Sequence, residues 1–488
     1  MKTRINCFIP FLDEAQVKET IQKLQQSELN LNIYLVSTQK KSDNKALGYP
    51  IIYVPALTST SAIQSIAEQA NSDYTLLYTK YTTLELGYFA LERMLKIADD
   101  SCAGMVYADH YQILGDQRKN APVIDYQKGS LRDDFNFGSV LLFNTEALKD
   151  SVNRMKASYD AAGLYDLRLK LSQKYKLEHI NEYLYSEIEK DTRKSGEKIF
   201  DYVDPKNRGV QIEMEKACTE HLKEIGGYLA PQFEKIEFEA DHFEYEASVI
   251  IPVRNRIKTV KDAIESVLKQ KTTFKFNLII IDNHSTDGTT EAIDSFKADD
   301  RLIHLIPKRK DLGIGGCWNA GVHHDKCGKF AVQLDSDDVY KDENTLQTMI
   351  NAFYEQNCAM VVGTYMMTDF NMNMIAPGVI DHKEWTPENG RNNALRINGL
   401  GAPRAFYTPV LREIKVPNTS YGEDYALGLN FSRQYQIGRV YDIVYLCRRW
   451  EDNSDASLDI VKMNAHNTYK DRIRTWELEA RINLNKKK

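Results

Sequence analysis

The chain has 488 residues, which is too many for one ordinary hydrophobic core, so we expect two or three domains. Its hydrophobic content of 42% is typical of a globular protein and excludes an intrinsically disordered one. The net charge of −6, well mixed along the chain, gives no indication of a nucleic-acid-binding protein.

The seven cysteines are scattered, without a CxxC pair or a His/Cys spacing typical of zinc sites. Reduced cytosolic thiols are the simplest interpretation. The first residues lead straight into a strand-like segment with no secretory signal pattern, and the apolar runs are too short to cross a membrane. We therefore expect a cytoplasmic protein without a transmembrane segment; peripheral membrane association and oligomer formation stay open.

The elements predicted for the first half alternate between strands and helices. A strand ends at Pro10 and a helical pattern follows it. Further strands are expected at 32–36, 51–55, 74–78 and 103–107, with a helix at 84–98 before the last of them. This alternation predicts right-handed βαβ units and a mostly parallel sheet, and hence an α/β fold.

The second half repeats this order after a charged connector. The connector, 189–245, contains a helix predicted for 210–229 and an acidic run from 233 to 246. A strand then ends at Pro252, and the later elements are strands at 277–281, 302–307, 330–334 and 359–364 and a helix at 344–356. The shared order favours an internal duplication over a chance likeness between two α/β domains.

From about Ser457 the chain is predicted to form a surface helix. Its expected buried stripe consists of Ile460, Met463, Tyr469, Ile473, Trp476 and Leu478. The predicted organisation is therefore a first α/β domain, a connector, a second α/β domain and a C-terminal helical segment, at 1–188, 189–245, 246–456 and 457–488.

Polar residues follow the first two strands of the second half, and parallel sheets bind ligands beyond these carboxyl ends. Pro252, Arg254 and Asn255 follow the first strand. Asp282 comes directly off the second, where its carboxylate could accept a hydrogen bond from a base N–H or a ribose hydroxyl. The rest of that loop has a structural alternative, because Asn, Ser, Thr and Asp also make turns and cap helices.

A glycine-rich segment, 312–321, includes Asn319 and opens a predicted helix. Such a helix start can approach phosphates, although a closely packed loop would have the same composition. Its spacing matches neither the dinucleotide-binding fingerprint nor the GxxxxGK[ST] motif.

Asp335, Ser336, Asp337 and Asp338 follow a short buried strand. Closely spaced carboxylates repel one another, and burial raises that cost unless a cation is present. Mg²⁺ and Mn²⁺ prefer oxygen ligands and often share them with phosphates. The alternative is a helix N-cap cluster, but the position at the end of a βαβ strand favours a metal and diphosphate site.

These segments resemble the inverting family 2 glycosyltransferases, which have the nucleotide-sugar-binding GT-A fold. The resemblance covers about 246–456, and the residues that carry it are SVIIPVRNR at 248–256, IIIDNHSTDGTTEAI at 279–293, the glycine-rich segment, QLDSDDVY at 333–340 and YGEDYAL at 421–427. Because several motifs occur in the family's order, the resemblance is specific to the superfamily, though not to a sugar.

The resemblance implies a role for each matching residue. The first loop and Asp282 would hold the nucleotide. Asp335 would contact the ribose or the metal, and Asp337 would bind the Mn²⁺ or Mg²⁺ that bridges the diphosphate. Asp424 would be the catalytic base, and the neighbouring Glu423 would orient the acceptor; without the other motifs, this pair would be interpreted as acidic residues at a helix N-terminus.

The implied reaction moves a sugar from a nucleoside-diphosphate sugar to a hydroxyl of a saccharide or glycolipid, with inversion, in polysaccharide or glycoconjugate synthesis. A hexosyl or N-acetylhexosaminyl group is expected. The chemistry suits the residue types, because a divalent cation stabilises the leaving diphosphate and a carboxylate takes the hydroxyl proton. The residues predicted to bind the donor are Pro252, Arg254, Asn255, Asp282, Asn319, Asp335, Ser336, Arg404 and Arg448.

Two positions depart from the family pattern. Trp318 stands where an Arg is common, and Trp450 stands where many members have a His that helps to hold the metal or the diphosphate. Arg448 or Arg449 could neutralise the diphosphate instead. Arg404, in a loop expected to face the donor sugar or the acceptor, could alternatively form a surface salt bridge.

The first half lacks these groups at the matching positions. Ser37 stands in the place of Asp282, residues 78–82 contain a lysine and no carboxylate, and the acidic pair is missing near 163–165. We therefore expect a degenerate, non-catalytic GT-A-like domain that serves packing, acceptor binding or dimer formation; a different site built on Asp109 or on 133–134 is the alternative.

Two other functions are compatible with the fold. A sugar nucleotidyltransferase also uses an α/β sheet and carboxylate-bound Mg²⁺, but it should have a glycine-rich basic loop after the first strand, and Pro252–Arg256 contains no glycine. A non-catalytic nucleotide-sugar-binding scaffold is the other possibility, and the intact Asp335, Asp337 and Asp424 argue against it.

Overall fold

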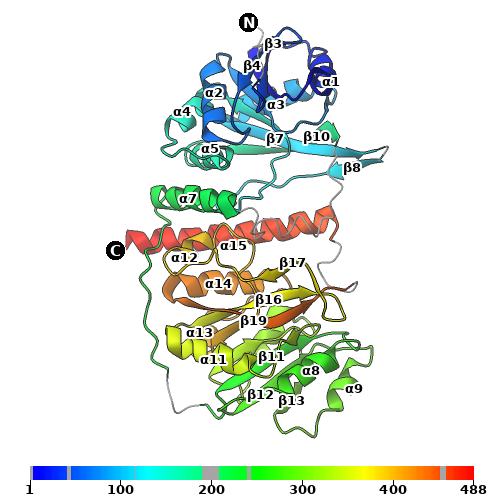
Figure 1. Ribbon diagram of the computed structural model, residues 1–488, viewed down its shortest axis with the longest axis vertical. Helices are drawn as coiled ribbons and strands as arrows, with labels where there is room; N and C mark the ends of the chain where they lie inside the picture. Colours follow the sequence, from blue (N-terminus) through cyan, green and yellow to red (C-terminus); the bar gives the residue numbers. More distant parts are fainter. Residues whose placement is uncertain are drawn as a thin grey trace. The chain divides into compact units, whose positions relative to one another are not determined.

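The computed structural model describes residues 4–40, 45–115, 117–188, 208–238, 243–450 and 458–487. It divides into two compact units, Met1–Tyr228 with Leu458–Lys488, and Leu229–Ser457 (Figure 1). Helix α7 (Arg208–Glu224), from the predicted connector, and the C-terminal helix α15 (Ile460–Lys486) both belong to the first unit. This differs from the predicted division, in which the end of the chain was a segment of its own. Parts of the predicted connector, 189–207 and 239–242, lie outside the described residues.

The first unit is built on a mixed sheet with the strand order β3-β4-β2-β1-β5-β9-β7-β10-β6, and β8 pairs with β7. The strands are β1 (Arg4–Pro10), β2 (Asn30–Ser37), β3 (Lys45–Ala46), β4 (Tyr49–Tyr53), β5 (Tyr74–Tyr78), β6 (Leu84–Leu86), β7 (Met105–Leu114), β8 (Gln117–Ala121), β9 (Val140–Asn144) and β10 (Leu177–Ile188). One core cluster joins the sheet to α1 (Glu14–Leu24) and α3 (Ala90–Ser101), and another joins it to α2 (Thr60–Gln69), α4 (Thr145–Asn153) and α5 (Gly163–Ser172).

The second unit has the strand order β13-β12-β11-β14-β18-β16-β19-β15, and β17 pairs with β16. The strands are β11 (Ala247–Val253), β12 (Phe276–Asp282), β13 (Leu302–Leu305), β14 (Phe330–Gln333), β15 (Val339–Tyr340), β16 (Met360–Thr368), β17 (Met374–Ile380), β18 (Arg404–Tyr407) and β19 (Ile437–Arg448). The helices are α8 (Val260–Leu268), α9 (Thr289–Asp294), α10 (Ile314–Val322), α11 (Thr345–Gln356), α12 (Gly390–Asn393), α13 (Thr408–Ile414) and α14 (Glu423–Gln434). The apolar runs of β11 and β12 are fully buried, as expected for parallel strands covered on both faces.

Apart from β3, the two sheets share their strand order and their parallel and antiparallel pairings. Strand β1 lies between parallel β2 and β5, as β11 lies between β12 and β14. Phe8 pairs with Leu77 as Ile250 pairs with Gln333, so the residue two beyond Leu77, Thr79, occupies the position of Asp335. The common origin of the two units stays a prediction, but their positions can be compared through this register.

Three predicted elements differ from the structure. The helix expected at 210–229 is α7, which ends at Glu224. The helix expected at 84–98 begins only at Ala90, because Leu84–Leu86 pairs antiparallel with β10 as strand β6. In the C-terminal helix, Ile460 and Trp476 are 39% and 55% exposed, so they are not part of a buried stripe. No helix in the described ranges is both long enough and apolar enough to cross a membrane.

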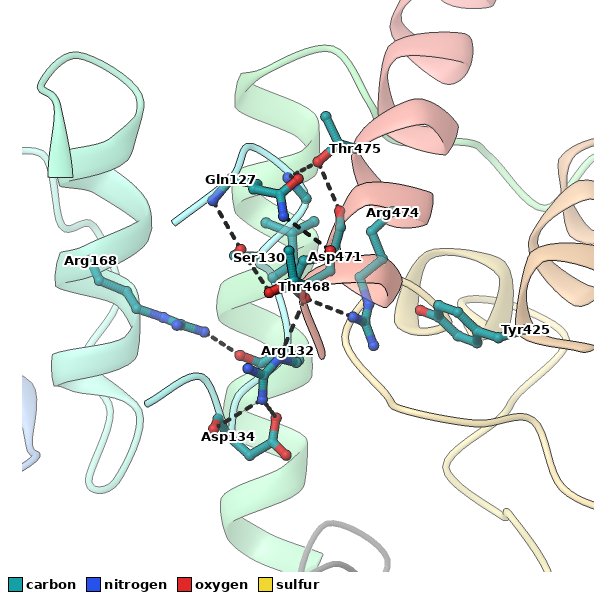
Figure 2. Close-up of polar contacts among 12 residues, drawn as sticks. Gln127, Ser130, Arg132, Asp134, Arg168, Tyr425, Thr468, Asp471, Arg474 and Thr475 are labelled. Atoms are coloured by element: carbon teal, nitrogen blue, oxygen red, sulfur yellow. Dashed lines mark hydrogen bonds and ion pairs between the residues drawn. The ribbon is translucent and has the colours of Figure 1, made fainter. Parts of the chain in front are cut away.

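The buried face of α15 is mainly charged. Figure 2 shows Asp471 at its centre, where it accepts a hydrogen bond from Ser130 (2.8 Å) and pairs with Arg132 (3.3 Å) and Arg474 (2.9 Å). Ser130 and Arg132 come from the loop that precedes β9, in the same unit. Because buried charges must be paired, these contacts fix α15 to the first unit through specific partners.

Candidate active site

The carboxylates predicted for the site lie together in a cleft of about 190 Å³ in the second unit. The cleft is lined by Pro252, Ile314, Trp318, Gln333, Asp335, Ser336, Asp337, Arg404, Phe406, Val416, Glu423, Asp424 and Leu427. Asp335 comes just after the carboxyl end of β14, and Glu423 and Asp424 open α14, where Gly422 takes a left-handed φ of 77° that favours glycine. The end of a parallel strand and the start of a helix thus bring Asp335 and Glu423, which are far apart in the sequence, to one cleft.

Gln333 organises the floor of the cleft. Its amide nitrogen donates to Asp335 Oδ1 (2.8 Å), and its amide oxygen accepts a hydrogen bond from the backbone N–H of Arg404 (3.1 Å). The Tyr445 hydroxyl accepts from the Asp335 backbone N–H (3.1 Å). These contacts join β14, β18 and β19 and hold the Asp335 side chain in one orientation.

The Asp cluster carries more negative charge than its surroundings compensate. Burial raises the pKa of Asp335, and the charge of Asp337 adds to the rise, while Arg404 opposes it. Burial, together with Asp337 and Asp335, raises the pKa of Asp338 well above its ordinary value. An added cation would relieve this repulsion.

Asp424 and Arg404 form an ion pair across the cleft, with 2.8 Å between Oδ2 and Nη1. The other carboxylate oxygen of Asp424 accepts a hydrogen bond from the Tyr425 backbone N–H (2.7 Å). Although burial lowers it, the carboxylates of Asp424, Asp335 and Glu423 hold the pKa of Arg404 above its ordinary value. Arg404 therefore keeps a positive charge next to Asp424 and favours its ionised form.

Glu423 differs from the neighbouring Asp424 in its protonation. Burial and then the charge of Asp424 raise the pKa of Glu423 to about 8. Its Oε2 atom is buried and has no hydrogen-bond partner among the described residues. At neutral pH the pair therefore presents one carboxylic acid, which can donate a hydrogen bond, beside the Arg404-paired carboxylate.

The raised pKa of Glu423 predicts how Glu423→Gln changes stability with pH. Between pH 4.5, the ordinary pKa, and about 8, the folded chain binds more protons than the unfolded chain, so the parent loses stability as pH rises through this window. Glutamine does not titrate. We expect the variant's Tm to equal the parent's at the acidic end and to exceed it above pH 8, as measured by scanning calorimetry.

The exposed Glu388→Gln is the matched control for this experiment, and its Tm should follow the parent's at every pH. Identical pH profiles for Glu423→Gln and the parent would contradict the buried, protonated state assigned to Glu423.

Asp337 contacts Arg256, which was not among the predicted site residues, and Trp450, which stands at the family's His position. The Arg256 Nε lies 3.8 Å from its Oδ2, and the Trp450 indole N–H donates to the same oxygen at 3.4 Å. The charged groups of Arg256 and Lys258 lie 6.0 and 5.5 Å from the Trp450 ring centre. Trp450 stands where the family pattern has a His, so this position supplies a hydrogen-bond donor and an aromatic face. In the sequence, the only indication that Arg256 could belong to the site was its position four residues after Pro252.

The residues present suit a divalent cation that is shared with a ligand. The described part of the chain contains no group of three or more His, Cys, Asp or Glu residues arranged to hold a metal. Asp335 and Asp337 supply oxygen donors, and Trp450 cannot ligate a metal. Mg²⁺ and Mn²⁺ commonly bind through one or two carboxylates together with substrate phosphates and water, and the cleft fits this arrangement.

Two residues predicted to bind the donor are buried outside the cleft lining. Asp282 is fully buried and accepts hydrogen bonds from the Ser285 backbone N–H (2.9 Å) and the Thr290 hydroxyl (2.5 Å). Although burial raises it, these hydrogen bonds hold the pKa of Asp282 below its ordinary value. Arg448 is 1% exposed and pairs with Asp262 at 2.7 Å. The structure gives both residues local contacts, and their binding to the donor stays a prediction.

The remaining predicted donor contacts are divided between the cleft and its surroundings. Pro252 and Ser336 line the cleft. The Asn319 amide is engaged with both backbone groups of Val416, at 2.7 and 2.9 Å. Asn255 accepts a hydrogen bond from the Thr286 backbone N–H (2.8 Å), and Arg254 is exposed. The loop after β11 is thus tied to the loop after β12, although neither Asn255 nor Arg254 lines the cleft.

The family model "Glycosyl transferase family 2" matches residues 248–402. Glycosyltransferase GlyG of Streptococcus pneumoniae is 30% identical over 122 residues, which are 25% of this chain and 40% of that protein. The matched region thus spans less than half the length of this relative.

Two further proteins match a longer part of the chain. The Escherichia coli protein WfgD, named UDP-Glc:alpha-D-GlcNAc-diphosphoundecaprenol beta-1,3-glucosyltransferase, is 26% identical over 239 residues, 48% of this chain and 85% of that protein. The crystal structure of S. aureus TarS 1-349 in complex with UDP-GlcNAc is 19% identical, covers 48% of this chain and 72% of that chain, and has a TM-score of 0.37, which is too low to support an argument. The family model and the curated relatives agree with the motif order, and residues 248–402 of this chain are similar to glycosyl transferase family 2.

Proposed function

We propose that the second unit transfers a sugar from a nucleoside-diphosphate sugar to an acceptor hydroxyl, with inversion of the anomeric configuration. The observation that carries this proposal is the meeting of two carboxylate pairs in one cleft, Asp335 with Asp337 and Glu423 with Asp424. The first pair suits a cation-bound diphosphate, and the second supplies a carboxylate base. Direct displacement requires both, on opposite sides of the reacting carbon.

Asp424 is the proposed general base. Its carboxylate takes the proton of the acceptor hydroxyl while the hydroxyl oxygen forms a bond to the anomeric carbon. The bond from that carbon to the diphosphate oxygen breaks on the opposite face, and the nucleoside diphosphate leaves with the electron pair. Arg404 keeps Asp424 ionised and oriented, and protonated Glu423 can donate a hydrogen bond to the acceptor.

The other end of the cleft holds the leaving group. Asp335 and Asp337 would bind Mn²⁺ or Mg²⁺, which, when present, stabilises the negative charge that develops on the diphosphate. Arg256, 3.8 Å from Asp337, adds a positive charge on the same side. Arg256 compensates only part of the negative charge of Asp335 and Asp337. This suits a site that binds a cation whose remaining ligands come from the substrate.

The proposed substrates follow the class of the relatives. WfgD is named for glucosyl transfer from a UDP-sugar to a saccharide carried on a lipid diphosphate. We propose a hexosyl or N-acetylhexosaminyl donor and a saccharide or glycolipid acceptor, used on the cytoplasmic side in polysaccharide or glycoconjugate synthesis. Among the described residues, no contact favours the nucleotidyltransferase or scaffold alternative over transfer.

Ligand-dependent stability tests donor binding. The parent is heated with UDP-glucose, UDP-N-acetylglucosamine or GDP-mannose, each with and without Mn²⁺. A donor at about 100 times its Kd should stabilise the folded state by about 2.7 kcal/mol, or roughly 5–10 °C in Tm. Asp337→Asn should lose the Mn²⁺-dependent part of this shift, whereas the exposed Asp442→Asn should keep it. If no nucleotide sugar in the panel raises the parent's Tm, the proposed donor site is wrong.

A further inference from the structure

The first unit contains a cavity of about 140 Å³ at the position that corresponds to the catalytic cleft. Thr79, which corresponds to Asp335 in the strand register, lines it. Leu141 pairs with Leu77 and so corresponds to Arg404, and Leu164, second in α5, corresponds to Asp424, second in α14. The first unit therefore has a cavity at the equivalent position. The residues proposed for transfer are absent from it, and one hydroxyl side chain and two apolar side chains stand in their places.

Arg168 lines this cavity and is only 6% exposed. Its Nη2 donates to the Arg132 carbonyl oxygen, as Figure 2 shows, but Nε and Nη1 are buried without a hydrogen-bond partner among the described residues. Two other walls of the cavity are the rings of Phe135 and Phe137, whose centres lie 5.7 and 5.6 Å from the guanidinium carbon. A charged donor group thus lies next to an aromatic cavity.

The neighbouring buried arginines have carboxylate partners. Arg132 pairs with Asp134 (2.8 Å) and Asp471 (3.3 Å), and Arg474 pairs with Asp471 (2.9 Å). In Figure 2 these ion pairs are visible, whereas the dashed line from Arg168 ends on a carbonyl oxygen. Within the described ranges, Arg168 forms no direct ion pair with a carboxylate, and its charge acts on Asp134 only at longer range, where it helps to lower the pKa of that residue. A buried cation without a directly bonded counter-ion is unfavourable, so a ligand anion would remove a specific cost.

We propose that this cavity binds a small anion through the carboxylate or phosphoryl oxygens of the ligand. The Nε–H and Nη1–H groups of Arg168 would donate charge-assisted hydrogen bonds to these oxygens. The apolar part of the ligand would pack on Phe135 and Phe137, which is the usual composition of small-molecule sites: mostly apolar walls with a few placed polar groups. The first unit would then be a binding module. Its cavity lies at the position equivalent to the catalytic cleft but is lined by residues that bind an anion.

The test uses the full chain carrying Asp337→Asn, so that binding in the catalytic cleft is separated from binding here. Isothermal titration with inorganic phosphate and with glucuronate distinguishes phosphoryl from carboxylate ligands. At least one of them should bind with a stoichiometry of one, and Arg168→Met should weaken that binding at least tenfold. Arg93→Met, an exposed arginine of the same unit, should not change it.

A second variant protects the test against misfolding. Leu164→Trp fills the cavity and leaves Arg168 in place, so it too should abolish binding, and it decides the question alone if Arg168→Met does not fold. The proposal is overturned if neither probe binds, which would leave ordered water as the partner of Arg168, or if binding is unchanged in these variants. Binding that is seen in the parent chain but is lost with Asp337→Asn would assign the anion to the second unit and would also overturn the proposal.

Discussion

Replacing Asp424 by Asn is expected to lower kcat by about 10²–10⁴-fold, the usual contribution of a positioned general base. The amide cannot accept the proton of the acceptor hydroxyl, and it also loses the ion pair with Arg404. Because the change is isosteric and the residue lies at the start of α14, the fold should be kept. The measurement is the initial rate of nucleoside diphosphate release at saturating donor and acceptor.

Asp442→Asn, an exposed Asp of β19 in the same unit, is the matched control and should keep the parent's rate. Glu423→Gln should lower the rate less than Asp424→Asn, since glutamine can still donate the hydrogen bond assigned to protonated Glu423. An Asp424→Asn rate within twofold of the parent's would remove Asp424 from the mechanism.

Asp337→Asn is expected to reduce the rate by about 10²-fold or more at the Mn²⁺ concentration that half-activates the parent. One of the two carboxylates that would share the cation with the diphosphate is lost, so the cation and the donor should both bind more weakly. A titration of the rate against Mn²⁺ separates the two effects: the midpoint should move to higher concentration, and excess Mn²⁺ should restore part of the activity.

The position of the Asp337 carboxylate beside Arg256 and Trp450 makes this result informative. If the charge of Arg256 and a hydrogen bond from Trp450 stabilised the diphosphate without a cation, the parent itself would not respond to Mn²⁺ or Mg²⁺. An unchanged rate and an unchanged midpoint in Asp337→Asn would contradict the metal assignment.

The fold and the centre of the site could be predicted because they depend on local patterns. Buried apolar runs that alternate with helical periodicity specify the strands, and the carboxyl ends of parallel strands meet at one edge of the sheet. Asp335 and Asp337 follow such a strand, and Glu423 and Asp424 open a helix after a glycine. Each motif was visible by itself, and the cleft contains all four side chains.

The burial and the partners of individual side chains could not be predicted, because they depend on residues far apart in the chain. Arg448 is paired with Asp262, 186 positions away. The Asp282 carboxylate accepts hydrogen bonds from its own loop and from Thr290. Although Asp282 ends a strand, it does not line the cleft. Trp450 follows β19 at the family's His position, but the hydrogen bond that its indole N–H donates to Asp337 could not be predicted from the sequence.

The C-terminal helix α15 is a larger example of burial that could not be predicted from the sequence. Of the expected apolar stripe, Ile473 and Leu478 are buried, but Ile460 and Trp476 are exposed. The charged residues Asp471, Arg474 and Arg481 are fully buried. Hydropathy patterns treat such residues as solvated, and only the ion pairs formed in the folded unit make their burial favourable. For the same reason the sequence could not show that α15 folds with the first unit.

The most direct test of the central claim, single-displacement glycosyl transfer in the cleft of the second unit, is the structure of the product. The parent is incubated with Mn²⁺, nucleotide sugars that have an α-linked diphosphate and a panel of saccharide and glycolipid acceptors, and the product is analysed by NMR. We predict a new glycoside with the inverted, β configuration. A product with retained α configuration, or the absence of any glycoside across the panel, would contradict the account.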